Sequence, residues 1–181
     1  MAFQAGGPHA QDRGLEAVTY AWREQSFVPT EATWEKPQGK NPALVMKKHY
    51  QIVGRGVGLV IGCGTFPTWN TYPGLFATLS TGNPVIVKAH SNAILPAAIT
   101  VRTIRAVLAE NGIDPNLVSL CVATQRTVTQ ALATHAAVKS IDFTGSNVFG
   151  QWLIENARQA QVYAELAGVN NIVIDSTDAY K

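Results

Sequence analysis

From about residue 52 onward, short apolar runs rich in β-branched residues alternate with longer segments of helical spacing. An apolar run without polar alternation is typical of a strand buried on both faces, as in a parallel sheet covered by helices. The runs predict strands at Val57–Ile61, Pro84–Val87, Val118–Val122, Lys139–Phe143, Val162–Glu165 and Asn171–Asp175. The intervening segments predict helices at Tyr72–Ser80, Asn92–Asn111, Thr127–Thr134 and Asn147–Ala157. The predicted fold class is therefore α/β, with an open parallel sheet.

The helix predicted at Asn92–Asn111 has the clearest boundary signals. Ser91 or Asn92 can cap its first turn, and Gly112 follows as a C-terminal stop. The apolar stripe of this helix is predicted at Ile99, Thr103, Val107 and Leu108.

Residues 1–50 have a different pattern. Leu15–Gln25 has the spacing of a helix, whereas Trp34–Pro42 contains two prolines and a glycine and predicts a loop or an extended arm. We therefore divide the chain into an N-terminal helix and arm, 1–50, and an α/β domain, 51–181.

Composition narrows the class of protein. Apolar residues make up 46% of the 181 residues and charged residues 14%, with a net charge of +2. The basic residues are scattered, so we expect no nucleic-acid partner. No leader pattern and no apolar run of roughly 20 residues is visible, which predicts a cytoplasmic protein that does not enter a membrane. Two cysteines without paired spacing indicate no disulfide framework.

Several familiar motifs are absent or misplaced. Gly54–Gly58 imitates a dinucleotide fingerprint, but it precedes a predicted strand instead of following one, so we interpret it as a turn into the sheet. The four histidines lack the spacing of metal ligands, so we expect no metal site.

In open parallel sheets, ligands bind beyond the carboxyl ends of the strands. Lys88 ends one predicted strand, where its ammonium can bind a phosphate or ribose or simply extend into solvent. Thr144-Gly145-Ser146 ends another and opens a helix, which suits a phosphate; the alternative is an ordinary turn capped by Ser146. Glu165 ends an apolar strand, where partial desolvation suits a general base, although a surface carboxylate is the alternative.

In this order and spacing, Lys88, Phe143–Gly150 and Glu165 resemble the cofactor-binding part of the aldehyde dehydrogenase superfamily. The resemblance implies that 51–181 is a Rossmann-like NAD(P)-binding domain, incomplete relative to the family. Gly145 then allows a close approach of the pyrophosphate to the following helix. The resemblance assigns cofactor contacts to Gly62, Cys63, Thr65, Lys88, His90, Ser91, Phe143, Thr144, Gly145, Ser146 and Phe149.

The segment after Lys88 bears on the choice of cofactor. Ser91 takes the place of the glutamate with which many family members hold the adenosine ribose. A glutamate would repel a 2′-phosphate, whereas Ser91 beside Lys88 and His90 can accommodate one, so NADP is favoured over NAD.

Two departures from the family concern the reacting centre and the pyrophosphate. Phe66-Pro67 matches the Phe-Pro pair of a family motif. In this alignment Thr65 takes the place of the family's asparagine, which stabilises an oxyanion. Asn70 is not expected to substitute, because it lies beyond the Phe-Pro turn. Ala123–Arg126 lacks the glycine turn of many members, so the nucleotide pose is expected to differ.

Glu165-Leu166-Ala167-Gly168 is similar to the family's segment whose glutamate activates the hydrolytic water. The resemblance implies a nucleophilic cysteine beyond Lys181; Cys63 and Cys121 are not expected to replace it, so the chain alone is predicted to be inactive. The alternative is a non-catalytic nucleotide-binding or assembly module derived from the same fold.

Within the superfamily, Trp34–Lys40 and Thr65–Phe76 resemble the branch that acts in phenylacetic acid degradation. The resemblance implies a small-molecule aldehyde substrate, formed by ring opening of an intermediate linked to coenzyme A, and a homo-oligomeric parent protein.

Overall fold

The computed structural model describes residues 2–168 and 171–173. Its centre is a five-stranded parallel sheet in the order β5-β4-β3-β6-β7. The strands are β3 (Val57–Ile61), β4 (Val85–Lys88), β5 (Val118–Cys121), β6 (Val138–Gly145) and β7 (Gln161–Leu166). The predicted α/β fold is confirmed. The sixth predicted strand is not seen: 171–173 form no strand, and 174–175 lie outside the described residues.

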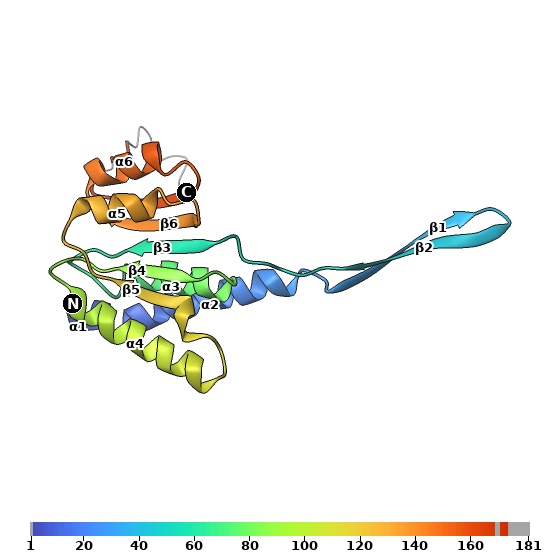
Figure 1. The fold of residues 1–181 in the computed structure, drawn as a ribbon, viewed down its shortest axis with the longest axis horizontal. Coiled ribbons are helices and arrows are strands. Elements are labelled where there is room, and N and C mark those ends of the chain that lie inside the picture. Colours follow the sequence, from blue (N-terminus) through green and yellow to red (C-terminus); the bar gives the residue numbers. More distant parts are fainter. Residues whose placement is uncertain (1, 169–170, 174–181) are drawn as a thin grey trace.

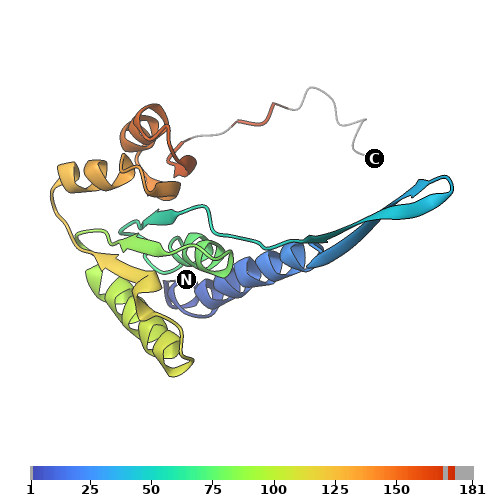
Figure 2. The same ribbon diagram turned by 45° about the vertical axis from the view of Figure 1, so that its right-hand side comes forward.

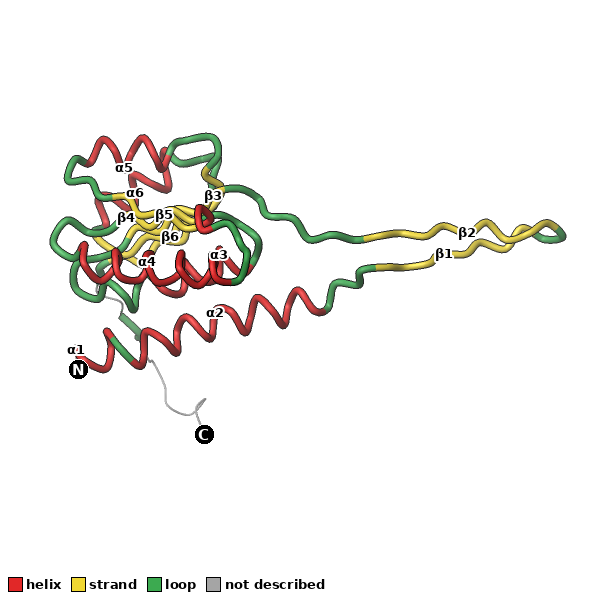
Figure 3. Tube along the Cα trace, turned by 60° about the horizontal axis from the view of Figure 1, so that its bottom comes forward, coloured by secondary structure: helices red, strands yellow, loops and turns green. Residues whose placement is uncertain are grey.

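Helices cover the sheet from two sides (Figures 1 and 3). One apolar cluster joins β3 and β6 to α5 (Arg126–Ala133) and α6 (Asn147–Asn156), and its fully buried centre includes Ile141 and Leu153. A second cluster joins β3, β4 and β5 to α3 (Tyr72–Ser80) and α4 (Ile94–Glu110). A short 3₁₀ turn, η1 (Pro115–Leu117), leads into β5. The four predicted helices are therefore confirmed, with small shifts at their ends.

The details predicted for α4 are partly wrong. Its N-cap is Ala93, which makes no side-chain cap hydrogen bond, so neither Ser91 nor Asn92 caps it. The predicted stop is confirmed, because Gly112 has a φ of +71°. The stripe was assigned to the wrong face: the side that meets the sheet carries Ala97, Val101, Ile104 and Leu108. Of the predicted stripe only Leu108 belongs to it, since Ile99, Thr103 and Val107 are exposed.

The N-terminal segment forms α1 (Ala2–Gly6) and α2 (Pro8–Ser26). The predicted helix is confirmed and begins earlier than Leu15. It lies along α3, and Gly14 permits the approach, because a Cβ there would sit 2.8 Å from the Phe76 ring. The amide of Gln25 donates to the Ser80 carbonyl at 3.0 Å. These contacts fasten α2 to the outside of the α/β layers.

Residues 31–49 form an antiparallel ribbon that extends away from the sheet (Figures 1 and 2). Its strands are β1 (Glu31–Gln38) and β2 (Asn41–His49), and Trp34 pairs with Met46. The predicted arm is thus a paired hairpin and not a loop. Its prolines are tolerated because both strands of a two-stranded ribbon are edges.

Gly54–Gly58 runs into β3 at the amino end of the sheet, as interpreted. The backbone N–H groups of Arg55 and Gly56 donate to the Asn83 side chain, at 2.6 and 3.1 Å. The segment therefore lies at the opposite end from the carboxyl edge. Among the described residues, no helix combines the length and apolar character needed to cross a membrane.

Candidate active site at the carboxyl edge of the sheet

The strand ends singled out in the sequence are neighbours in space. Ile61 at the end of β3 pairs with Lys88 on one side and with Phe143 on the other, and Thr144 pairs with Glu165. The backbone N–H of Gly62 donates to the Lys88 carbonyl at 3.1 Å. The parallel register therefore brings the segments after β3, β4, β6 and β7 to one edge.

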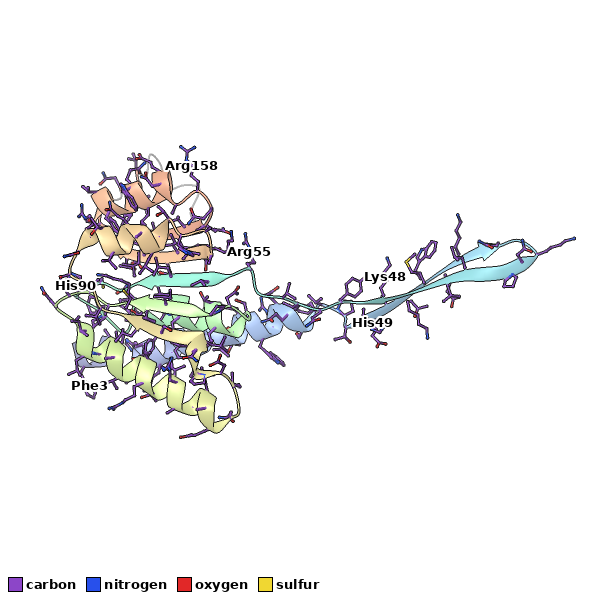
Figure 4. All side chains as sticks on the ribbon, in the orientation of Figure 1. Phe3, Lys48, His49, Arg55, His90 and Arg158 are labelled. Carbon is purple, nitrogen blue, oxygen red and sulfur yellow. The ribbon has the colours of Figure 1, made fainter. Side chains whose placement is uncertain are left out.

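The loops after β3 and β4 touch at Gly64 and His90. A Cβ at Gly64 would lie 3.0 Å from His90 Nδ1, so this contact leaves little room for a side chain. His90 Nδ1 accepts the backbone N–H of Asn92 at 3.2 Å, which leaves Nε2 for another partner. Ser91 is exposed in the same turn, and Lys88 is half-buried. Figure 4 shows His90 at the end of the sheet opposite the hairpin.

The turn after β6 leads directly into a capped helix. Ser146 is the N-cap of α6, and its side chain accepts the backbone N–H of Phe149 at 3.4 Å. A Cβ at Gly145 would lie 2.7 Å from the Phe143 ring, so the turn can carry only glycine without a shift. The first turn of α6 therefore presents its backbone and helix dipole at the edge.

Two predicted cofactor contacts are placed differently from the rest. Phe143 and Phe149 are only 5% and 8% exposed, and their rings meet edge to face with centroids 5.4 Å apart. Both side chains belong to the core beneath α6. Any contact that these residues make with a cofactor is therefore left to their backbone.

Arg126 was not among the predicted site residues; it appeared only as the end of Ala123–Arg126, the segment that lacks the family's glycine turn. Its guanidinium lies over the Phe149 ring, 5.4 Å from the centroid. Arg126 begins α5 and Phe149 lies in the first turn of α6, so this cation–π contact joins the starts of the two helices. It places an exposed positive charge beside the Ser146 turn.

An amide–carboxylate contact lies beside that turn. The Asn70 amide nitrogen is 3.4 Å from Glu165 Oε2 and 3.4 Å from Thr144 Oγ1. Asn70 reaches Thr144 and Glu165 although it lies beyond the Phe-Pro turn, because the chain turns again between Phe66 and Tyr72. Spacing from the Phe-Pro pair could not show this. The signal that could have identified Asn70 is the Trp69-Asn70 pair, because the family's asparagine also follows a tryptophan in its Pro-Trp-Asn-Phe-Pro motif. The expectation about the oxyanion role of Asn70 stays a prediction.

Thr65 and Cys63 lie on the other side of Asn70. Cys63 Sγ is 3.4 Å from Thr65 Oγ1 and donates to Asn70 Oδ1 at 3.4 Å. Thr65 therefore contacts Cys63, whereas the residue in contact with Glu165 is Asn70. One asparagine side chain separates the Cys63 thiol from the Glu165 carboxylate.

Glu165 is exposed in this chain, so the expectation of partial desolvation is wrong here. Its strand is the edge of the sheet, and its side chain points away from α6. On the same side of the sheet, a cavity of about 430 Å³ opens between β6, β7, α2 and the start of α3. Its lining comprises Arg13, Trp69, Asn70, Pro73, Asp142, Thr144, Tyr163, Ala164 and Glu165.

A parallel sheet with helices on both sides, a glycine turn and a capped helix at its carboxyl edge is a Rossmann-like α/β fold. Residues 9–180 match the family model described as "Aldehyde dehydrogenase family", and the chain belongs to that family.

Individual relatives agree with this assignment. The chain is 37% identical over 130 residues to α-ketoglutaric semialdehyde dehydrogenase 2 of Azospirillum brasilense, covering 68% of this chain and 25% of the relative. A crystal structure of an NAD-dependent aldehyde dehydrogenase from Burkholderia multivorans is 62% identical, with a TM-score of 0.90, over 93% of this chain and 31% of that one. The chain thus spans between a quarter and a third of these relatives.

A more distant structure shares the fold. Glyceraldehyde-3-phosphate dehydrogenase from Methanocaldococcus jannaschii, complexed with NADP, superposes with a TM-score of 0.66 at 18% identity. The match covers 89% of this chain and 34% of that one.

Proposed function

We propose that the chain is the cofactor-binding part of an aldehyde dehydrogenase whose nucleophilic cysteine lies outside these 181 residues. The observation that carries the proposal is the contact between Asn70 and Glu165 beside the Thr144–Ser146 turn. It puts a carboxylate with a fixed hydrogen-bond partner next to a turn suited to pyrophosphate. The alternative is a nucleotide-binding or assembly module without catalysis.

The edge fits a dinucleotide. The turn at Gly145 leads into α6, and the N–H groups at the start of that helix can bind the pyrophosphate. Lys88 ends β4, and His90 and Ser91 follow it in the next loop; their ammonium, imidazole and hydroxyl groups can hold the adenosine ribose and its substituents. Gly62, Cys63 and Thr65 supply the adjoining wall. A nucleotide held by these residues would supply the acceptor for a hydride from the substrate.

Glu165 is the residue of this chain to which we assign proton transfer. After oxidation the substrate is held as a thioester, and a water must attack it to release the acid. The Glu165 carboxylate can take a proton from that water, and the Asn70 amide orients the carboxylate. Asn70 or Thr65 supplies the donor for the oxyanion; Asn70 would give up its contact with Thr144 or Glu165 to do so, because its amide has only two N–H groups.

For the cofactor we propose NADP, with NAD as the alternative. Ser91 brings no negative charge to the ribose site, and Lys88 and His90 bring groups that can bind a 2′-phosphate. The Burkholderia multivorans relative is named NAD-dependent, which supports the alternative.

A substitution at Ser91 separates the two cofactors. We expect Ser91→Glu to weaken NADP binding by about 1–2 kcal/mol, because a carboxylate would face the 2′-phosphate, and to leave NAD binding unchanged or tighter. Isothermal titration of both nucleotides measures the effect, and Ser91→Gln, which has the size of glutamate without its charge, is the matched control. An unchanged NADP affinity in Ser91→Glu would exclude the 2′-phosphate from this loop.

For the substrate we propose an aldehyde of phenylacetate degradation, linked to coenzyme A, as in the phenylacetic acid degradation protein PaaN. The support is the similarity of Trp34–Lys40 and Thr65–Phe76 to that branch. Relatives in other organisms are named for other aldehydes, including α-ketoglutaric semialdehyde.

We further propose that the full-length protein is a homo-oligomer, since only 14% of the chain is charged and the hairpin exposes Trp34, Leu44, Val45 and Met46.

Glu165→Gln in the full-length protein tests the proposed function. The amide keeps the shape but removes the basic oxygen, so the first turnover should still produce a burst of reduced nucleotide. Steady-state turnover should then fall by roughly 10²–10⁴-fold, the range of general-base catalysis. Rapid mixing with absorbance detection measures both phases. A full-length protein that binds the nucleotide but oxidises no aldehyde would favour the module.

A further inference from the structure

Asp142 is a second carboxylate on the side of the sheet that carries Glu165. The strand β6 alternates, so Ile141 and Phe143 enter the core beneath α6 while Asp142 and Thr144 point the other way. Asp142 pairs with Tyr163 and Thr144 pairs with Glu165 in the parallel register. Asp142 and Glu165 are therefore diagonal neighbours on one face, and both line the cavity of about 430 Å³.

The Asp142 carboxylate lies against the backbone of α3. A Cβ at Gly74 would overlap its Oδ2 and Cγ atoms, so the absence of a side chain at Gly74 makes the space that the carboxylate fills. Among the described residues, the ion pairs are Arg13–Glu16, Arg23–Glu24 and His49–Glu31, and none includes Asp142. Its charge is thus half-buried between helix and sheet, without a paired cation.

Several other charged or titratable groups lie around Asp142. Glu165 and Tyr163 face Asp142 from β7, and Arg13 of α2 lines the same cavity but is paired with Glu16 at 2.9 Å. Burial raises the pKa of Asp142 from 3.8 to about 6, and the charge of Glu165 adds to the increase. A wider opening on this side also contains charged or titratable groups from α2, the segment before β3, and β6 itself: Glu16, Tyr20, Glu24, Arg55 and Lys139.

We propose that Asp142 accepts the proton that Glu165 removes from the hydrolytic water, a role that rests on the proposed function of Glu165. The proton moves from the Glu165 carboxylic acid to the Asp142 carboxylate, directly or through a water in the cavity between them. Glu165 is thereby returned to its basic form, and Asp142 releases the proton to solvent. No oxidant or reductant takes part.

The proposal explains why a carboxylate is held in this place. A general base that stays protonated cannot act in the next turnover, so its proton must leave. A buried acid that titrates near neutral pH can both receive a proton from a neighbouring carboxylic acid and lose it again to water. Thr144 and Asn70, which contact each other beside Glu165, cannot do this because neither titrates.

The test compares Asp142→Asn, Asp142→Ala and Glu165→Gln in the full-length protein. We expect Asp142→Asn to keep the burst of reduced nucleotide and to lower steady-state turnover by roughly tenfold, less than loss of the general base, because solvent can replace the acceptor slowly. The steady-state rate of the unsubstituted protein should fall as the pH drops through about 6, where Asp142 becomes protonated and can no longer accept. Asp12→Asn, which removes an exposed carboxylate on α2, is the matched control.

Chemical rescue separates proton transfer from a structural role. Added imidazole or acetate should raise steady-state turnover of Asp142→Ala, and should leave the unsubstituted protein unchanged. Rescue within a single variant does not depend on how well that variant folds. Unchanged turnover in Asp142→Asn, or a low rate in Asp142→Ala that no added base restores, would overturn the proposal. Full turnover in Glu165→Gln would instead overturn the proposed function.

Discussion

The two faces of β6 and β7 differ sharply. One face carries Ile141, Phe143 and Val162 into the core beneath α5 and α6. The other carries Asp142, Thr144 and Glu165 toward a cavity that helices cover only in part. The same two strands therefore provide the apolar core on one side and the candidate chemistry on the other.

The alternation of a strand makes this division possible. Successive side chains of a strand point to opposite faces, so a single residue step separates a core position from a site position. The covered face fixes the strands in register by burying apolar side chains. That rigid support then holds Thr144 opposite Glu165 and in reach of Asn70. We therefore expect substitutions on the covered face to lower the free energy of unfolding strongly. A substitution of the buried charge on the open face should raise it by a smaller amount.

Leu153→Ala should produce the largest effect. Leu153 is 0% exposed between α6 and the sheet, and truncating it leaves a cavity in addition to the lost transfer free energy. We expect a loss of about 2–5 kcal/mol in the free energy of unfolding. Urea denaturation measures it. Its neighbour Ile154 is 50% exposed, so Ile154→Ala is the matched control, with a change within about 0.5 kcal/mol. Equal losses in the two variants would contradict the assignment of the covered face.

The covered face was predictable from the sequence. Apolar runs that alternate with segments of helical spacing indicate a parallel sheet, because helices that cover such a sheet bury its strands. The resulting elements, such as Tyr72–Ser80, agree with the structure. Which face of α4 packs against the sheet was not predictable in the same way. That helix is apolar around much of its circumference, so the pattern could not show that Val101 is buried while Ile99 and Val107 are exposed.

The open face was only partly predictable. Glu165 and the Ser146 turn follow directly from the positions of strand ends, which the pattern gives. Asn70 could not be placed, because its approach to Glu165 depends on how the chain turns between Phe66 and Tyr72. Asp142 lies within the predicted strand Lys139–Phe143, so its position alone did not indicate a site residue. The sequence also does not show that Gly74, far away in the chain, makes room for its carboxylate.

Asp142→Asn should produce the smaller effect, and it should stabilise the protein. Because the folded state raises the pKa of Asp142 from 3.8 to about 6, the folded protein binds the proton more tightly than the unfolded chain. The cost of ionising Asp142 is absent below about pH 4, grows as the pH rises, and is complete above about pH 6. Asparagine never carries that charge, so at pH 8 the variant should be more stable by about 1–3 kcal/mol. At pH 4 the two proteins should differ little. Urea denaturation across this pH range measures the difference, with Asp12→Asn as the exposed control. A constant difference at all pH values would show that Asp142 contributes through packing against α3 and not through its charge.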